Sequence, residues 1–86
     1  MYFVYVLQSL RDGNKYVGFT TNLEQRLSEH NRGRSFATKS RLPLELIYFE
    51  ASRNEEDARR REGYLKTTRG RRFLAKRLKV FSRSKL

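Results

Sequence analysis

The chain opens with two runs of hydrophobic residues whose lengths and patterns are typical of strands. Residues 2–8 are almost entirely aromatic or aliphatic, so both faces of a strand built from them are apolar, as expected for a strand covered on two sides. Asp12-Gly13 is a strong turn signal, and residues 15–20 form the second run. The pattern predicts an antiparallel hairpin. Tyr16 and Gly18 point to the same face of it, because side chains alternate along a strand.

A hydroxyl residue followed three positions later by Glu occurs at Thr21 and again at Ser52. This is the pattern of a capping box, in which the hydroxyl accepts a free helix amide and the Glu reaches back. It predicts one helix that ends near residue 31, before an Arg-Gly pair, and another that ends near residue 67. The inward-facing positions expected on these helices are Leu23, Leu27, Ala58, Tyr64 and Leu65.

The remaining segments are a basic loop over residues 32–42, a third strand over 44–50 and a last helix over roughly 70–79. The order of elements predicts an α+β fold, an α/β sandwich with a three-stranded antiparallel sheet flanked by about three helices. The chain has 86 residues, which suits one small domain. We assign that domain to residues 1–80, followed by a basic C-terminal tail over 81–86.

The net charge of the chain indicates the kind of partner it binds. The chain has 20 Lys and Arg residues against 9 Asp and Glu, a net charge of +11, and such an excess favours a polyanion, most often nucleic acid. Residues 53–86 hold 13 of the basic residues and 4 of the acidic ones, so the phosphate-facing surface is expected mainly there. The candidate nucleic-acid-binding residues are Lys15, Lys39, Arg59, Arg60, Arg71, Arg72 and Lys76.

Several classes of protein are disfavoured by what the sequence lacks. There is no cysteine, which excludes a disulfide framework and a Cys-based zinc site. No apolar window approaches a membrane span, and the first residues do not have the pattern of a secretory signal. The cytoplasm is therefore the expected location. A membrane-surface helix over residues 71–81 is an alternative, but we expect its apolar side chains to pack into the core.

Two tyrosine-bearing segments carry a family resemblance. Phe3-Val4-Tyr5 and Tyr16-Val17-Gly18 are separated by ten residues, and Arg26, His30 and Glu62 follow in order. Together with the order of elements, they resemble the GIY-YIG nuclease family. The chain is most similar to its small stand-alone bacterial members and to the N-terminal nuclease domain of the UvrC repair subunit. The resemblance implies the GIY-YIG nuclease-like fold and metal-dependent cleavage of DNA phosphodiester bonds.

The resemblance also implies roles for the polar residues of these motifs. Tyr5 is expected to be the general base or a proton relay, and Tyr16 to position water or phosphate. A phenol has a pKa of about 10, so either nearby cations, namely Lys15, Arg26 and the metal, must favour the Tyr5 phenolate, or an adjacent base must take over the proton. His30 competes for the role of base, because the ordinary pKa of its imidazole, about 6.5, suits neutral pH.

Arg26 is expected to clamp the scissile phosphate through its planar guanidinium. Glu62 is expected to be the sole protein ligand of a divalent ion, most plausibly Mg²⁺, with Mn²⁺ as the second choice. A salt-bridged structural glutamate is the alternative for Glu62.

The leading prediction is an endonuclease that cleaves structured or damaged DNA with low sequence specificity, as in DNA repair, and that uses no small-molecule cofactor. A monomer or weak dimer is expected. Two departures from the family pattern favour an alternative: Phe3 stands where a glycine is typical, and no Asn or Gln follows Glu62. That alternative is a catalytically weak module that binds DNA or RNA on the same scaffold.

Overall fold

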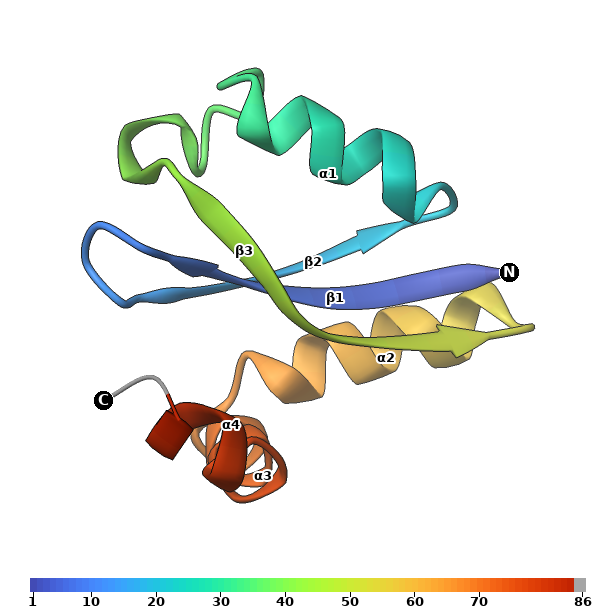
Figure 1. Ribbon diagram of the computed structural model, residues 1–86. Coiled ribbons are helices and arrows are strands. Elements are labelled where there is room, and N and C mark those ends of the chain that lie inside the picture. The colour runs from blue at the N-terminus through green and yellow to red at the C-terminus, as the bar shows by residue number, and fades with distance from the viewer. Residues whose placement is uncertain (85–86) are drawn as a thin grey trace.

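A computed structural model describes residues 1–84 of the chain, with side chains described through residue 81. Its centre is a three-stranded antiparallel sheet in the order β2-β1-β3, which Figure 1 shows between two layers of helices. The strands are β1 (Tyr2–Ser9), β2 (Lys15–Thr20) and β3 (Leu44–Ser52). The predicted hairpin and α+β class are confirmed, and the third strand continues two residues beyond its predicted end.

The central position of β1 explains why both of its faces are apolar. Val4 and Val6 are buried in a core cluster on one face, whereas Tyr5 and Leu7 are buried in a separate cluster on the other. The sheet therefore divides the core in two. The Tyr5 face is covered by α1 (Leu23–Asn31), and the opposite face by α2 (Glu55–Leu65), α3 (Thr68–Arg77) and α4 (Lys79–Ser84) (Figure 1).

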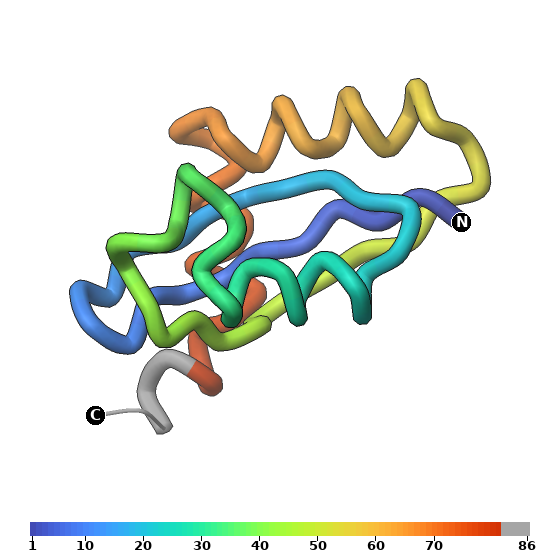
Figure 2. The backbone as a smooth tube through the Cα atoms, turned by 90° about the horizontal axis from the view of Figure 1, so that it is seen from above, coloured from blue at the N-terminus to red at the C-terminus, as the bar shows by residue number. Residues whose placement is uncertain are grey.

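Helix α2 packs against all three strands, and seen from above it extends on the β2 side of the sheet (Figure 2). Its residues Ala58 and Leu65 are buried as predicted. Tyr64 was predicted to face inward, and this is wrong because its side chain is 37% exposed. Ala58 and Leu65 are seven residues apart and share a face, whereas Tyr64 is turned about 100° from Leu65.

Both helix starts differ from the predicted capping boxes. The cap of α1 is Asn22, whose side-chain oxygen accepts the Gln25 amide at 3.1 Å, and the cap of α2 is Asn54. The amide of each asparagine donates to a hydroxyl two residues earlier: Asn22 to Thr20 at 3.1 Å, and Asn54 to Ser52 at 3.3 Å. Asparagine caps helices as well as serine does, so the hydroxyls close the preceding turn instead.

The last predicted helix is two helices. Helix α3 begins after its cap Thr67 and ends at Arg77, and α4 follows after Leu78. The predicted boundary between residues 80 and 81 falls inside α4, and the last two residues of the predicted tail lie outside the described residues. The loop over residues 32–42 contains one short 3-10 helix, Lys39–Arg41. No helix within residues 1–84 has the length and apolar character needed to cross a membrane.

Candidate active site

Tyr5 lies at the centre of the candidate site. It pairs with Gly18 across the β1–β2 ladder, and its ring crosses the sheet directly over that glycine. A Cβ atom at Gly18 would overlap the Tyr5 hydroxyl and ring carbon Cζ, and would lie 2.9 Å from Cε1. Only glycine therefore leaves room for the phenol to reach α1 and the loop beyond it.

A line of hydrogen bonds runs from solvent into the core through the Tyr5 hydroxyl. Arg26 Nε donates to the Tyr5 oxygen at 3.4 Å, that oxygen lies 2.8 Å from His30 Nε2, and His30 Nδ1 lies 2.7 Å from Thr38 Oγ1. Because Arg26 has no proton-accepting atom, the phenol proton points to His30 Nε2. The imidazole then donates its Nδ1 proton to Thr38. We call these four residues the polar relay.

Burial determines the charge states within the polar relay. Tyr5 and His30 are both fully buried. Burial raises the pKa of Tyr5 above its ordinary value and outweighs the opposing hydrogen bond from Arg26. The pKa of His30 is lowered, first by burial and then by the positive charge of Arg26. Near neutral pH the relay therefore holds a neutral phenol and a neutral imidazole.

Of the two predicted ways to use the Tyr5 phenol, its raised pKa favours transfer of its proton to an adjacent base over a phenolate stabilised by cations. Arg26 does lower the pKa of Tyr5, but desolvation of the buried oxygen is the larger effect. His30 is the one fully buried residue of α1.

Tyr16 stands between the polar relay and the surface. Its ring centroid lies 6.3 Å from that of Tyr5 and 5.3 Å from that of His30, and the side chain is partly exposed. Tyr16 also lines a cleft of about 700 Å³. We call this the basic cleft, because its cationic lining residues are Lys15, Arg41, Lys66 and Arg71.

Arg26 is placed to meet a ligand that approaches from solvent. Its side chain is 37% exposed, and one terminal nitrogen lies 3.1 Å from Glu29. The pKa of Arg26 is raised, first by its hydrogen bond to Tyr5 and then by that to Glu29. Glu29 therefore holds part of the guanidinium, while the exposed part stays open to an anion.

Glu62 lies on α2, on the face of the sheet opposite α1 (Figure 1). Its carboxylate oxygens lie 3.1 Å from Lys66 Nζ and 3.9 Å from Arg59, and the side chain is 17% exposed. The negative charge of Glu62 contributes to the raised pKa of Tyr5. Glu62 is thus an electrostatic neighbour of the polar relay, although it takes part in none of the relay's three hydrogen bonds.

The donor set around Glu62 limits the metal it could hold. No group of three His, Cys, Asp or Glu side chains within residues 1–84 could surround an ion. A single carboxylate fits Mg²⁺, which keeps most of its waters and binds through one or two carboxylates plus substrate phosphate. It does not fit a zinc or calcium cage.

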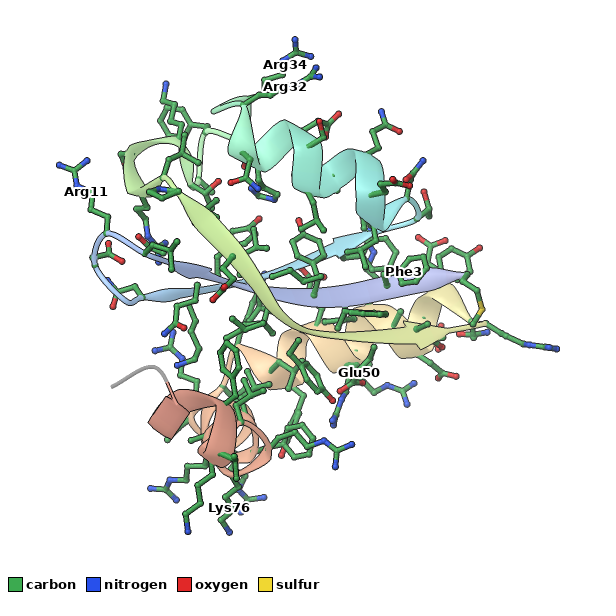
Figure 3. The ribbon with its side chains drawn as sticks, in the orientation of Figure 1. Phe3, Arg11, Arg32, Arg34, Glu50 and Lys76 are labelled. Carbon is green, nitrogen blue, oxygen red and sulfur yellow. The ribbon has the colours of Figure 1, made fainter. Side chains whose placement is uncertain are left out.

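The predicted nucleic-acid-binding residues do not form one surface. Lys15 and Arg71 line the basic cleft, whereas Arg59 stacks over Phe19 at 3.8 Å and pairs with Glu55 and Glu62. Arg60 pairs with Glu56 and Asp57 on the exposed side of α2. Arg72 and Lys76 are exposed on α3, and Lys76 points away from the sheet on the side opposite α1 (Figure 3). Lys39 lies in the loop near Thr38, over the Phe36 ring.

The sequence reasoning missed two residues that complete the site. Thr38 binds His30 and Glu29 binds Arg26. Glu29 could have been found from its three-residue spacing to Arg26 on a helix. Thr38 carries no such signal, because it lies in an irregular loop. Phe3, at the position typical of glycine, is a partly buried strand residue whose ring lies 6.3 Å from that of Phe49.

A sheet and helices that gather two tyrosines, an arginine and a histidine beside a basic cleft define a domain of the nuclease type. The chain belongs to the GIY-YIG family, whose domains are endonucleases: the family model described as "GIY-YIG catalytic domain" matches residues 1–78. Nucleases of this family act on DNA and generally depend on a divalent metal.

Small bacterial proteins are similar to about three quarters of the chain. A UPF0213 protein of Clostridium perfringens is 42% identical over 67 residues, which cover 77% of this chain and 71% of the relative. A UPF0213 protein of Staphylococcus haemolyticus is 39% identical over a region that covers 77% of this chain and 80% of the relative. The solution structure of a UPF0213 protein from Bacillus halodurans matches with a TM-score of 0.55 and 31% identity, covering 88% of this chain and 84% of that one.

Proposed function

We propose that the protein is an endonuclease that uses Mg²⁺, or Mn²⁺ in its place, to hydrolyse phosphodiester bonds in structured or damaged DNA with low sequence specificity. The observation that carries the proposal is the polar relay, in which Arg26, Tyr5 and His30 are joined by hydrogen bonds of 3.4 and 2.8 Å. A proton acceptor, a phenol and a cation in one line are the groups that water attack on a phosphate requires.

The neutral forms of Tyr5 and His30 support a relay in preference to a phenolate base. As a proton leaves the attacking water for the Tyr5 oxygen, the phenol passes its own proton to His30 Nε2. No charged phenolate forms in the buried site, and the accepting group is an imidazole whose lowered pKa keeps it neutral and ready to accept a proton near neutral pH. Tyr16, partly exposed at the basic cleft, is the phenol that positions the water or the phosphate.

Arg26 supports the same reaction by binding the phosphate. The exposed part of its guanidinium can donate parallel hydrogen bonds to two phosphate oxygens and stabilise the negative charge that develops on them. Its hydrogen bond to Tyr5 keeps that phosphate beside the relay.

Glu62 would hold the divalent ion, which when bound supplies positive charge to the phosphate oxygens. For this its carboxylate must exchange Lys66 and Arg59, its present partners, for the ion. Those cations are then free to pair with the phosphates of the substrate. We further infer that the protein acts in the cytoplasm, as a monomer or weak dimer.

The test is nicking of supercoiled plasmid DNA with Mg²⁺ by the wild type, Glu62→Gln and Glu56→Gln. Glu56 is the matched control, because it lies on the same helix, is 85% exposed and, like Glu62, pairs with a cation four residues on. We expect Glu62→Gln to abolish nicking and Glu56→Gln to retain it. DNA binding, measured in EDTA, should be preserved in both variants.

A second candidate is the catalytically weak module that binds DNA or RNA. It is favoured by one observation, the two cations that already neutralise Glu62. The same experiment separates the two functions. Salt-dependent binding of nucleic acid without nicking by the wild type would support the binding module, since phosphate contacts make affinity fall steeply with salt. Equal nicking by Glu62→Gln would remove the metal role from Glu62.

A further inference from the structure

Phe36 is the most exposed large hydrophobic side chain among the described residues. Its exposed fraction is 86%, compared with 68% for Val80 and 50% for Phe49. Burial of a phenylalanine side chain stabilises a protein by roughly 1.5–3 kcal/mol. A ring left almost wholly in water therefore contributes little to the fold, and its position calls for another explanation.

A hydrogen-bonded turn in the loop keeps the Phe36 ring exposed to solvent. The Ser35 carbonyl accepts the amides of Thr38 and Lys39 at 3.2 and 2.9 Å. Ser35 and Thr38 are themselves buried, and Thr38 binds His30 in the polar relay at 2.7 Å. The chain is therefore fixed on both sides of Phe36. The ring is presented next to the candidate active site by the same turn that supports the relay.

The surroundings of the ring are cationic. Lys39 Nζ lies 4.8 Å from the ring centroid, and Arg32 and Arg34 point outward from the same segment (Figure 3). This combination does not suit an apolar protein surface, because the flanking charges would have to be desolvated. It suits nucleic acid, in which a base stacks on an aromatic ring while cations contact the neighbouring phosphates.

We propose that Phe36 stacks on an unpaired nucleobase of the substrate strand, with Lys39 and Arg34 contacting the flanking phosphates. The proposal rests on the function proposed above and names its substrate class. A paired base is covered on both faces by its neighbours, whereas a base in a loop, a gap or a single strand is open to stacking. The protein would therefore prefer DNA with unpaired bases beside the cleavage point.

Binding in EDTA tests the stacking separately from catalysis. A single-stranded oligodeoxynucleotide and a blunt duplex of the same sequence are compared at one salt concentration, with the wild type and Phe36→Ala. We expect Phe36→Ala to weaken single-strand binding about 5- to 150-fold, the range measured for loss of one stacked base. Duplex binding should change less than about twofold, because phosphate contacts dominate it.

Tryptophan substitution gives a direct readout, because the chain contains no Trp. Emission from Phe36→Trp should be quenched on addition of the single strand. Emission from the control Phe49→Trp, a half-exposed position on β3, should not change. Unaltered thermal unfolding of Phe36→Ala is expected from the exposure of the ring, and would show that the fold is intact.

Three outcomes would overturn the proposal. The first is an equal effect of Phe36→Ala on the single strand and the duplex, or no effect on either. The second is a response of Phe36→Trp emission only to anionic phospholipid vesicles or to protein concentration, which would assign the ring to a membrane or to a second copy. The third is wild-type protein that binds neither oligonucleotide, in which case the proposed function fails as well. Selective loss of single-strand binding in a protein that does not nick DNA would support the stacking and reject the nuclease.

Discussion

The closest packing at the candidate site is between Gly18 and Tyr5, and Gly18→Ala tests it directly. The added methyl would lie 2.9 Å from Tyr5 Cε1 and nearer still to Cζ and the hydroxyl, whereas carbon atoms pack comfortably at about 3.5–4.0 Å. The phenol must therefore move by roughly 1 Å. It cannot then keep both its 2.8 Å contact to His30 and its 3.4 Å contact to Arg26.

Two effects of Gly18→Ala follow from this displacement. Overpacking of a buried site destabilises by about 1–3 kcal/mol. In a domain of this size each 1 kcal/mol lowers the melting temperature by roughly 4–8 °C, so a fall of about 8–16 °C is expected for a loss near 2 kcal/mol. Nicking should fall by at least about 10²-fold, because the relay loses its geometry. Calorimetry and the plasmid assay measure the two effects.

Gly63→Ala is the matched control for this substitution. Gly63 lies in α2 with no heavy atom within 4 Å of an added Cβ. The same change there should stabilise the helix by about 0.5–1 kcal/mol and leave nicking intact. A Gly18→Ala protein with the melting temperature and activity of the wild type would refute the passage of Tyr5 over Gly18.

Two further predictions concern the partners of Tyr5. Arg26→Lys removes the planar guanidinium and its Nε donor, so nicking should fall about 10²-fold. The free energy of unfolding should change by less than about 1 kcal/mol, since the ion pair with Glu29 is exposed. Nicking at the wild-type rate would contradict the role of Arg26 in binding the phosphate. The pKa of His30 is lowered in the folded protein, whereas the imidazole pKa in the unfolded chain is near 6.5, so below pH 6.5 the unfolded chain binds a proton more readily than the folded protein does. The contribution of neutral His30 to the free energy of unfolding is therefore full above pH 6.5 and is lost as pH falls through the lowered pKa, with a slope of at most about 1.4 kcal/mol per pH unit. Denaturant unfolding across pH 4–8 should show this slope in the wild type but not in His30→Asn, and parallel curves would exclude it.

Local rules explain why much of the site could be predicted from the sequence. Strand alternation places Tyr16 and Gly18 on one face, and the four-residue spacing of Arg26 and His30 places them one turn apart on a helix. The register of the hairpin brings Tyr16 and Gly18 to Tyr5, and α1 brings Arg26 and His30 to its hydroxyl. The continuous apolar run of residues 2–8 likewise indicates a strand that is covered on both faces.

Features that depend on distant packing could not be predicted in the same way. The burial of His30 arises from the loop that brings Thr38 against its ring, and no periodicity describes such a loop. The charge states of Tyr5 and His30 follow from that burial. The helix starts were misplaced for a different reason: Asn22 and Asn54 compete with nearby hydroxyls for the same role, and their backbone geometry decides the outcome.

The attachment of α1 has a consequence for the motions of the protein. Of its nine residues only His30 is fully buried, and that side chain is held by Tyr5 and Thr38. The layer that carries the reactive groups is therefore attached to the sheet by the His30 side chain together with the partly buried Leu23 and Leu27, which pack against the Tyr5 cluster. Brief detachment of this layer, visible as hydrogen–deuterium exchange of the α1 amides, would take the relay apart. A bound phosphate on Arg26 would suppress it.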